Sequence, residues 1–178
     1  MYNCIKQLPP ILTQSMPENI YHLIETLDPS HEHIFLIGFA CDAGAFHCDS
    51  RTGSEKAPDC LRDIMKTVTM KPMPAHFEIH DCGNITQGED FRMALYELQE
   101  TIKVITTSKI RSVVIVVGGS DDLGAAVARG ASGCEHLLRL DSALDAGSAF
   151  RKQAFKDGPV VVHELHHKSH LKVIVQDS

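Results

Sequence analysis

The sequence lacks the features that mark nucleic-acid-binding and membrane proteins. Its 17 lysine and arginine residues are outnumbered by 23 aspartate and glutamate residues, which gives a formal net charge of -6 at pH 7. A surface of that sign repels a phosphate backbone, so we expect no nucleic-acid partner. No stretch approaches the roughly 20 consecutive apolar residues that a membrane-spanning helix needs. We therefore expect no membrane association.

The sequence also lacks CxxC pairs and a secretion signal. Its six cysteines are widely scattered, without the spacing of a disulfide framework or a zinc cage. Residues 1–10 do not combine a charged head with an apolar core. These absences indicate reduced thiols and predict a cytoplasmic protein.

What the sequence does contain is an alternation of strand-like and helix-like segments. Apolar, β-branched runs predict strands at residues 33–39, 77–81, 113–117, 137–140, 160–163 and 172–176. Helical spacing of apolar residues predicts helices at residues 58–65, 89–107, 123–131 and 148–155. This alternation predicts an α/β domain in which helices cover a mainly parallel sheet.

The length of 178 residues suits a single domain with its own core. Residues 1–30 are rich in proline around one amphipathic helix at residues 18–27. We therefore predict an N-terminal arm of residues 1–30 that packs on an α/β domain of residues 31–178.

The strand at residues 113–117 leads directly into a group of carboxylates. It has no polar alternation, which is typical of a strand covered on both faces of a parallel sheet. Gly118-Gly119 then allows a sharp turn, and Asp121 and Asp122 follow. These carboxylates are expected at the carboxyl end of the strand, where open α/β sheets place their binding sites.

The strand at residues 137–140 shows the same arrangement, because Asp141 and Asp145 follow it. If the two strands are neighbours, four carboxylates meet in one crevice and require a neutralising divalent cation. The alternative is that these aspartates cap the helices that follow them.

A series of short motifs runs from Leu36 to Asp145. In chain order the motifs are Leu36-Ile37-Gly38-Phe39 with Asp42 and Gly44, Arg51-Thr52-Gly53-Ser54, Pro58 with Leu61-Arg62, Asp81-Cys82-Gly83-Asn84-Ile85, Gly118-Gly119-Ser120-Asp121-Asp122, and Asp141-Ser142-Ala143-Leu144-Asp145. The series resembles the signature of the ureohydrolases, the family of arginase, agmatinase and formimidoylglutamase.

The resemblance implies a three-layer arginase/deacetylase-like α/β fold, incomplete in its C-terminal half. It implies metal-assisted hydrolysis of a guanidino or formimidoyl C–N bond, with a pair of manganese ions that activates a bridging water. The implied partners are a small amidine or guanidine substrate and further subunits in a homo- or hetero-oligomer.

The metal-ligand motifs depart from the family pattern. Asp121 stands where the family has its first histidine ligand, and Ala143 stands where it has its second. The later SxDxDxxDP stretch does not occur. The resemblance leaves Asp121, Asp141 and Asp145 as predicted ligands, with Asp122 and His163 as further candidates. Three carboxylates are few for two cations, since each takes about four to six donors.

Two functions therefore remain open: a metal-dependent hydrolase with impaired or lost activity, and a catalytically inactive paralogue that acts as a regulatory or structural subunit. A third, minor alternative is a zinc metalloprotease, because residues 163–167 fit the HExxH pattern. That pattern works only on a helix, whereas the preceding Gly158-Pro159 and three valines predict a strand.

Overall fold

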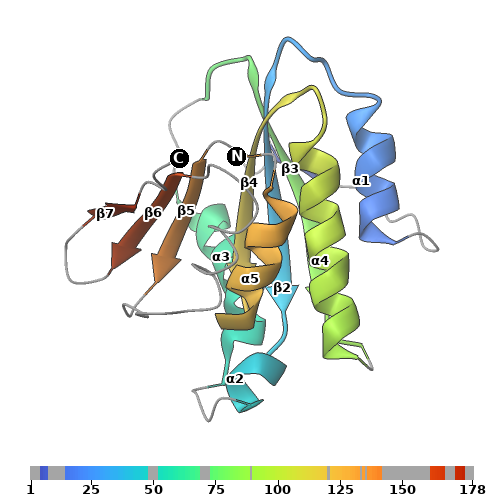
Figure 1. Ribbon diagram of the computed structural model, residues 1–178. Coiled ribbons are helices and arrows are strands. Elements are labelled where there is room, and N and C mark those ends of the chain that lie inside the picture. The colour runs from blue at the N-terminus through green and yellow to red at the C-terminus, as the bar shows by residue number, and fades with distance from the viewer. Residues whose placement is uncertain are drawn as a thin grey trace.

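The structure is a computed structural model that describes residues 5–7, 15–47, 52–68, 73–88, 90–119, 121–132, 134, 136–141, 161–166 and 171–174. Four parallel strands form the main sheet in the spatial order β1-β3-β2-β4 (Figure 1). These strands are β1 (Ile5–Gln7), β2 (Glu32–Ala40), β3 (Phe77–Thr86) and β4 (Arg111–Gly118). The helices are α1 (Met16–Ile24), α2 (Ala43–His47), α3 (Ala57–Thr67), α4 (Phe91–Thr106) and α5 (Asp121–Gly130), with a short 3-10 helix η2 (Ser54–Lys56).

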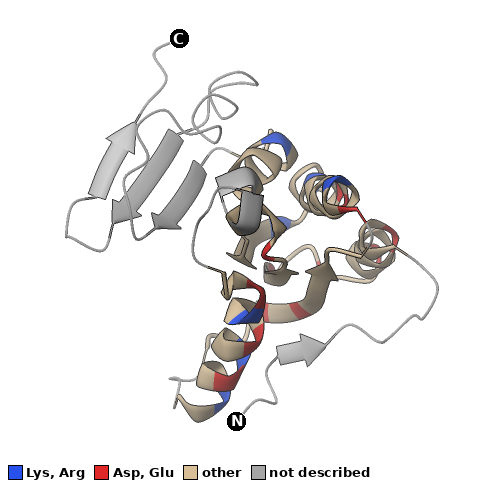
Figure 2. Ribbon diagram, turned by 90° about the horizontal axis from the view of Figure 1, so that it is seen from below, with Lys and Arg blue, Asp and Glu red and all other residues tan. Residues whose placement is uncertain are grey.

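Helices cover the main sheet on both faces and so make three layers. Helices α1, α4 and α5 pack on one face, and α3 packs on the other (Figures 1 and 2). The predicted α/β class with a mainly parallel sheet is therefore confirmed. Within the described part of the chain, no helix is both long enough and apolar enough to span a membrane.

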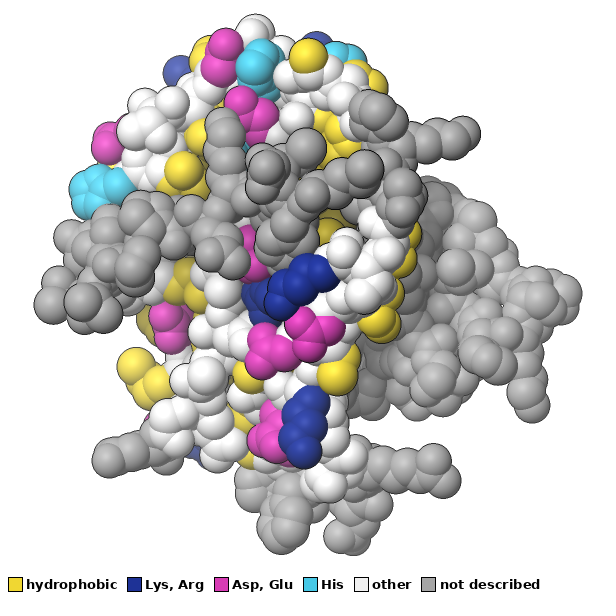
Figure 3. All heavy atoms as spheres, turned by 180° about the vertical axis from the view of Figure 1, so that it is seen from behind, with side chains coloured by type: hydrophobic (Ala, Val, Ile, Leu, Met, Phe, Trp, Pro, Cys, Tyr) yellow, Lys and Arg dark blue, Asp and Glu magenta, His cyan; other side chains and the backbone are white. Residues whose placement is uncertain are grey.

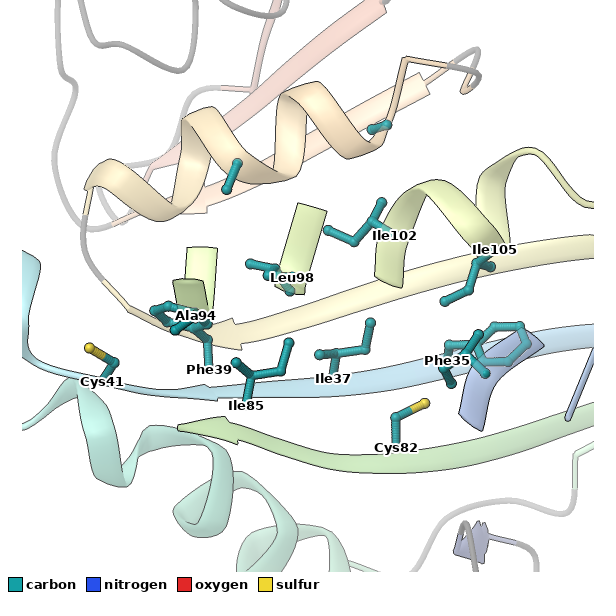
Figure 4. Packing of buried hydrophobic residues seen from close by; sticks show 13 residues of the cluster. Phe35, Ile37, Phe39, Cys41, Cys82, Ile85, Ala94, Leu98, Ile102 and Ile105 are labelled. Carbon is teal, nitrogen blue, oxygen red and sulfur yellow. The ribbon is translucent and has the colours of Figure 1, made fainter. Parts of the chain in front are cut away.

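The core lies between β2 and α4. Phe35, Ile37 and Phe39 alternate along β2 and are fully buried against the apolar face of α4 (Figure 4). On α4, Leu98 and Ile102 recur four residues apart on the face that meets them, as the helical spacing predicts. Each such side chain contributes about 1.5–3 kcal/mol by burial, so this contact fixes α4 on the sheet.

The two faces of β4 are not equally covered, which corrects one prediction. Val114 and Val116 pack into the core, but Val113 and Ile115, which point the other way, are 57% and 42% exposed. The prediction of a strand covered on both faces is therefore wrong. A run of β-branched residues favours a strand but does not specify what packs on each face.

The remaining strands form a separate sheet. Strands β5 (His136–Asp141), β6 (Val161–His166) and β7 (Leu171–Ile174) lie in that order, with β5 and β6 parallel and β6 and β7 antiparallel. Strands β4 and β5 belong to different sheets, so the hypothesis that they are hydrogen-bonded neighbours is wrong. Periodicity identifies strands but not their partners. The helix predicted at residues 148–155 lies outside the described residues.

Two further details differ from the sequence predictions. The helical spacing of Leu61, Ile64 and Met65 predicts that these residues form the buried face of α3, but Ile64 is 57% exposed, whereas Pro58 at the start of the same helix is buried. The segment before α1 contributes β1, which pairs with β3 and was not predicted. The division into an arm of residues 1–30 and a domain of residues 31–178 stays a prediction.

Candidate functional site

The parallel pairing of β2, β3 and β4 brings the motifs on these strands together near their carboxyl ends. The carboxyl ends of β2, β3 and β4 lie side by side, because Phe39 pairs with Ile85 on one side and with Gly118 on the other. Open α/β sheets bind their ligands at this edge. The candidate site therefore begins with the side chains that build it.

Arg62 joins helix α3 to strand β3 beside the candidate site. Its guanidinium donates from Nε and Nη2 to the Asp81 carboxylate, over distances of 2.7–3.1 Å. It also donates from Nη1 to Oδ1 of Asn84 at 2.6 Å, and from Nη2 to the Gly83 carbonyl at 3.0 Å. The Asp81 carboxylate raises the pKa of Arg62, so this guanidinium stays charged. Arg62 therefore has a structural role, because its N–H groups donate to other residues of the protein.

Two glycines allow neighbouring residues at the carboxyl ends of these strands to pack closely. A Cβ at Gly38 would lie 2.0 Å from Oδ1 of Asn84 and 2.7 Å from Cβ of Pro58. Gly118 has a φ of 106° and lies against the Phe39 carbonyl, which a Cβ would meet at 2.4 Å. Only glycine fits both positions, which explains why glycine occurs in these two motifs.

The loop after β2 is organised by Asp42. Its carboxylate accepts hydrogen bonds from the Ser54 hydroxyl and from the backbone N–H groups of Gly53 and Glu55. These donors, the Ser54 hydroxyl first, hold the pKa of Asp42 below its ordinary value of 3.8. The first two motifs of the series are thus fastened to each other by one carboxylate.

Cys82, in the Asp81–Ile85 motif of β3, is poorly suited to act as a nucleophile. Burial, more than the nearby Asp81 charge, raises the pKa of Cys82 to about 12, so almost none of it is thiolate at neutral pH. Burial likewise raises the pKa of Cys41. Covalent catalysis by these two thiols is therefore disfavoured.

Four of the five predicted metal ligands lie in described helices or strands, but their side chains lie outside the described part of the structure. Asp121 and Asp122 are the first two residues of α5, Asp141 is the last residue of β5, and His163 lies within β6. Asp145 is outside the described residues. This ligand set stays a prediction. The start of a helix also favours a carboxylate through the helix dipole, so the capping alternative stays open as well.

The number of predicted carboxylates would suit one divalent cation better than a pair. Asp121, Asp141 and Asp145 would offer three hard oxygen donors, and the strands before Asp121 and Asp141 are in different sheets. Three carboxylates leave a six-coordinate cation room for water but do not enclose two cations.

The HExxH segment is extended where the structure describes it. Residues 161–166 form β6, which confirms the strand prediction. A strand separates residues four apart by about 13 Å, whereas the zinc-protease pattern needs them one helical turn apart.

A different cluster of possible ligands was missed by the sequence reasoning. Among the described residues, His33, Glu78 and His80 place one ligand atom each within 4.8 Å of one another. They lie near the amino ends of β2 and β3, at the opposite end of the sheet from the motif residues. A histidine early in each of two strands was the available signal, but only the pairing of the strands brings the two together.

Comparison with solved structures defines the fold class first. The chain has the arginase-like α/β fold: it matches the oxidized *Trypanosoma cruzi* formiminoglutamase over 77% of its length and 50% of that chain, with a TM-score of 0.55 and 21% identity. The same enzyme with Mn2+ matches over 69% of this chain and 44% of that one, with a TM-score of 0.54 and 20% identity.

Comparison with characterised sequences then supports the family. The chain is 32% identical to formimidoylglutamase of *Vibrio cholerae* serotype O1 over 107 residues, which are 59% of this chain and 29% of that protein. It is 28% identical to the formimidoylglutamase of *Enterobacter* sp. (strain 638) over 129 residues, 69% of this chain and 40% of that protein. No family model matches the chain. The chain is similar to the ureohydrolases, as its motifs predict, and it spans well under two thirds of the length of these relatives.

Proposed function

We propose that the protein is a hydrolase of the ureohydrolase type, which cleaves the C–N bond of a formimidoyl or guanidino group in a small molecule. The observation that carries the proposal is the interlocking of the motif residues at one sheet edge, where Arg62 joins Asp81 to Asn84 and Gly38 packs on Pro58. The formimidoylglutamase relatives favour the formimidoyl substrate over the guanidino one.

A divalent metal, manganese by analogy with the family, would supply the hydrolytic step by lowering the pKa of a bound water. Asp121, Asp141 and Asp145 would hold it, with Asp122 and His163 as further donors. The arginine-linked scaffold would hold the loops beside these residues in place. Because three carboxylates suit one cation better than two, we expect low activity.

The second candidate function is that of a catalytically inactive subunit. It is favoured by Asp121 and Ala143 at the two histidine positions, and by the exposure of Val113 and Ile115 on β4. Strand β4 lies at an edge of the main sheet and pairs only with β2 among the described strands. An exposed edge strand with apolar side chains favours pairing with another chain. Strand β4 therefore suits assembly into a homo- or hetero-oligomer.

An activity assay distinguishes the two candidates. Purified protein with added Mn²⁺ would be tested for release of formamide from formimidoylglutamate and of urea from arginine and agmatine. The first function predicts formamide release that is abolished in the double variant D141N/D145N. The matched control is D63N, which removes a carboxylate from the exposed surface of α3. Activity that is absent, or equal in both variants, would contradict the hydrolase proposal.

Assembly is measured separately by analytical ultracentrifugation. The subunit function predicts that D141N/D145N assembles like the original protein, whereas V113T/I115T assembles less. A protein that stays monomeric at every concentration, alone and with a formimidoylglutamase, would exclude the subunit function. The cytoplasmic localisation and the oligomeric state stay predictions.

A further inference from the structure

The amino ends of β2 and β3 carry a histidine-carboxylate cluster that the proposed hydrolysis does not use. His33 pairs along the sheet with Ser112, and Phe39, six residues further on, pairs with Gly118 at the carboxyl edge. Six residues of strand span about 20 Å. The cluster is therefore well separated from the candidate site.

Three atoms of this cluster form an isosceles triangle. Nδ1 of His33 lies 3.1 Å from Nε2 of His80, and each of these nitrogens lies 3.8 Å from Oε2 of Glu78. A point in the plane of the triangle is about 2.1 Å from all three atoms, which matches Zn–N and Zn–O bond lengths of roughly 2.0–2.2 Å. These separations match the ligand spacing around one zinc ion.

The orientation of His33 is already that of a metal ligand. Its Nε2 lies 2.9 Å from the backbone carbonyl of Asp28. A carbonyl oxygen only accepts, so Nε2 carries the proton and Nδ1 accepts a hydrogen bond from Nε2 of His80. A bound metal would take the place of the proton between these two nitrogens. A hydrogen bond from the second ring nitrogen to a carbonyl is the usual support of a histidine that binds metal.

Glu78 is supported in a similar way. Its second oxygen, Oε1, lies 3.2 Å from Nδ1 of His31, which leaves Oε2 directed at the two buried imidazoles. The side chains of His33 and His80 are 0% and 1% exposed, and that of Glu78 is 20% exposed. A cation bound here would be largely shielded from water but reachable from the side of Glu78.

We propose that His33, Glu78 and His80 form a binding site for one divalent transition metal of the zinc class, which clamps β2 to β3 at the amino end of the sheet. Two imidazoles and one carboxylate prefer such a metal over Mg²⁺ or Ca²⁺, which select oxygen ligands. The three protein ligands leave a fourth position for water. The site differs in donor type from the carboxylates predicted to hold manganese, and it lies at the opposite end of the main sheet from Gly118.

The test compares zinc binding by the full chain and two matched variants after removal of metal with a chelator. E78Q keeps the shape of the side chain but removes its charge, and H22Q changes a histidine on the exposed face of α1. Zinc affinity, measured by competition with a chromophoric chelator, should fall at least about tenfold in E78Q and stay unchanged in H22Q. Zinc should raise the melting temperature of the original protein and of H22Q more than that of E78Q.

A second comparison excludes the other histidines of the chain. Zinc binding should persist when His163, His166, His167 and His170 are all replaced by glutamine, and also in D141N/D145N. Binding that is lost with those four histidines, or that is equal in E78Q and the original protein, would overturn the proposal and leave His33 and His80 as a hydrogen-bonded pair only.

Circular dichroism of metal-free E78Q should match that of the original protein. If E78Q fails to fold, cobalt absorption of the original protein decides, because a four-coordinate histidine site gives visible bands and their absence would contradict the site.

Discussion

The guanidinium of Arg62 forms a salt bridge with the carboxylate of Asp81, in which Nη2 and Oδ1 are 2.7 Å apart. The side chain of Asp81 is 4% exposed and that of Arg62 is 12% exposed, so the pair is shielded from water. It links α3, which covers one face of the sheet, to the middle of β3 (Figure 1). Figure 3 shows the outer face of α3, where charged side chains of both signs lie along the helix and apolar side chains gather beside it.

Removing one partner of this pair should be costly. In D81N the arginine keeps its charge but loses its buried counter-ion, and we expect a loss of about 3 kcal/mol in the free energy of unfolding. The control is D59N, because the Asp59 side chain is 69% exposed and also contacts Arg62; it should cost less than about 1 kcal/mol. Urea denaturation followed by circular dichroism measures both. Equal losses in the two variants would show that burial does not decide the strength of the Asp81 contact.

Gly38 should not tolerate a methyl group. G38A places a Cβ against Asn84 and Pro58, which belong to two different elements, and we expect a loss of roughly 1–3 kcal/mol from overpacking. The matched control is G88A, where φ is 56° and nothing lies within 4 Å of a Cβ; its strain costs about 1 kcal/mol. Thermal unfolding of both variants tests this. A G38A protein at least as stable as G88A would contradict the close packing described for this edge.

Asp42 should make the free energy of unfolding depend on pH in the acidic range. Its folded-state pKa lies below the ordinary value of 3.8 because Ser54 and two backbone N–H groups donate to the carboxylate. The stabilisation is therefore present above pH 3.8 and is lost as the pH falls through the folded-state pKa. D42N should cost about 1 kcal/mol at pH 7, and this difference should shrink in more acidic buffers. Urea denaturation over a series of pH values measures it, and a difference that grows on acidification would have the wrong sign.

The cysteines should differ strongly in reactivity. Cys60 is exposed on α3, whereas Cys82 is buried with a pKa of about 12. At pH 8 on the order of one Cys82 in ten thousand is ionised, so iodoacetamide should label Cys60 more than a hundredfold faster. Peptide mapping by mass spectrometry reports the two sites separately in one sample. Denaturing the protein in urea should remove the difference, whereas comparable labelling of both cysteines in the folded protein would contradict the burial of Cys82.

Local sequence alone determined the longer helices and strands, but not β1, α2 or the short helix η2. The spacing of apolar residues in 89–107 predicts α4 because side chains three and four apart share one face of a helix, and β2 follows from an uninterrupted apolar run. The order of the short motifs was also sufficient to indicate the ureohydrolase relatives. These features depend on neighbours along the chain, which a sequence displays directly.

Tertiary structure decided what depends on residues distant in sequence. Strand partners are one example, since nothing local distinguishes a β4 that pairs with β5 from one that pairs with β2 alone. The exposure of Ile64 is another, because helical periodicity gives a face but not the surface opposite it. The His33-His80 contact joins residues 47 positions apart. It exists because β2 and β3 pair in parallel with one particular register, which the packing of the whole sheet selects.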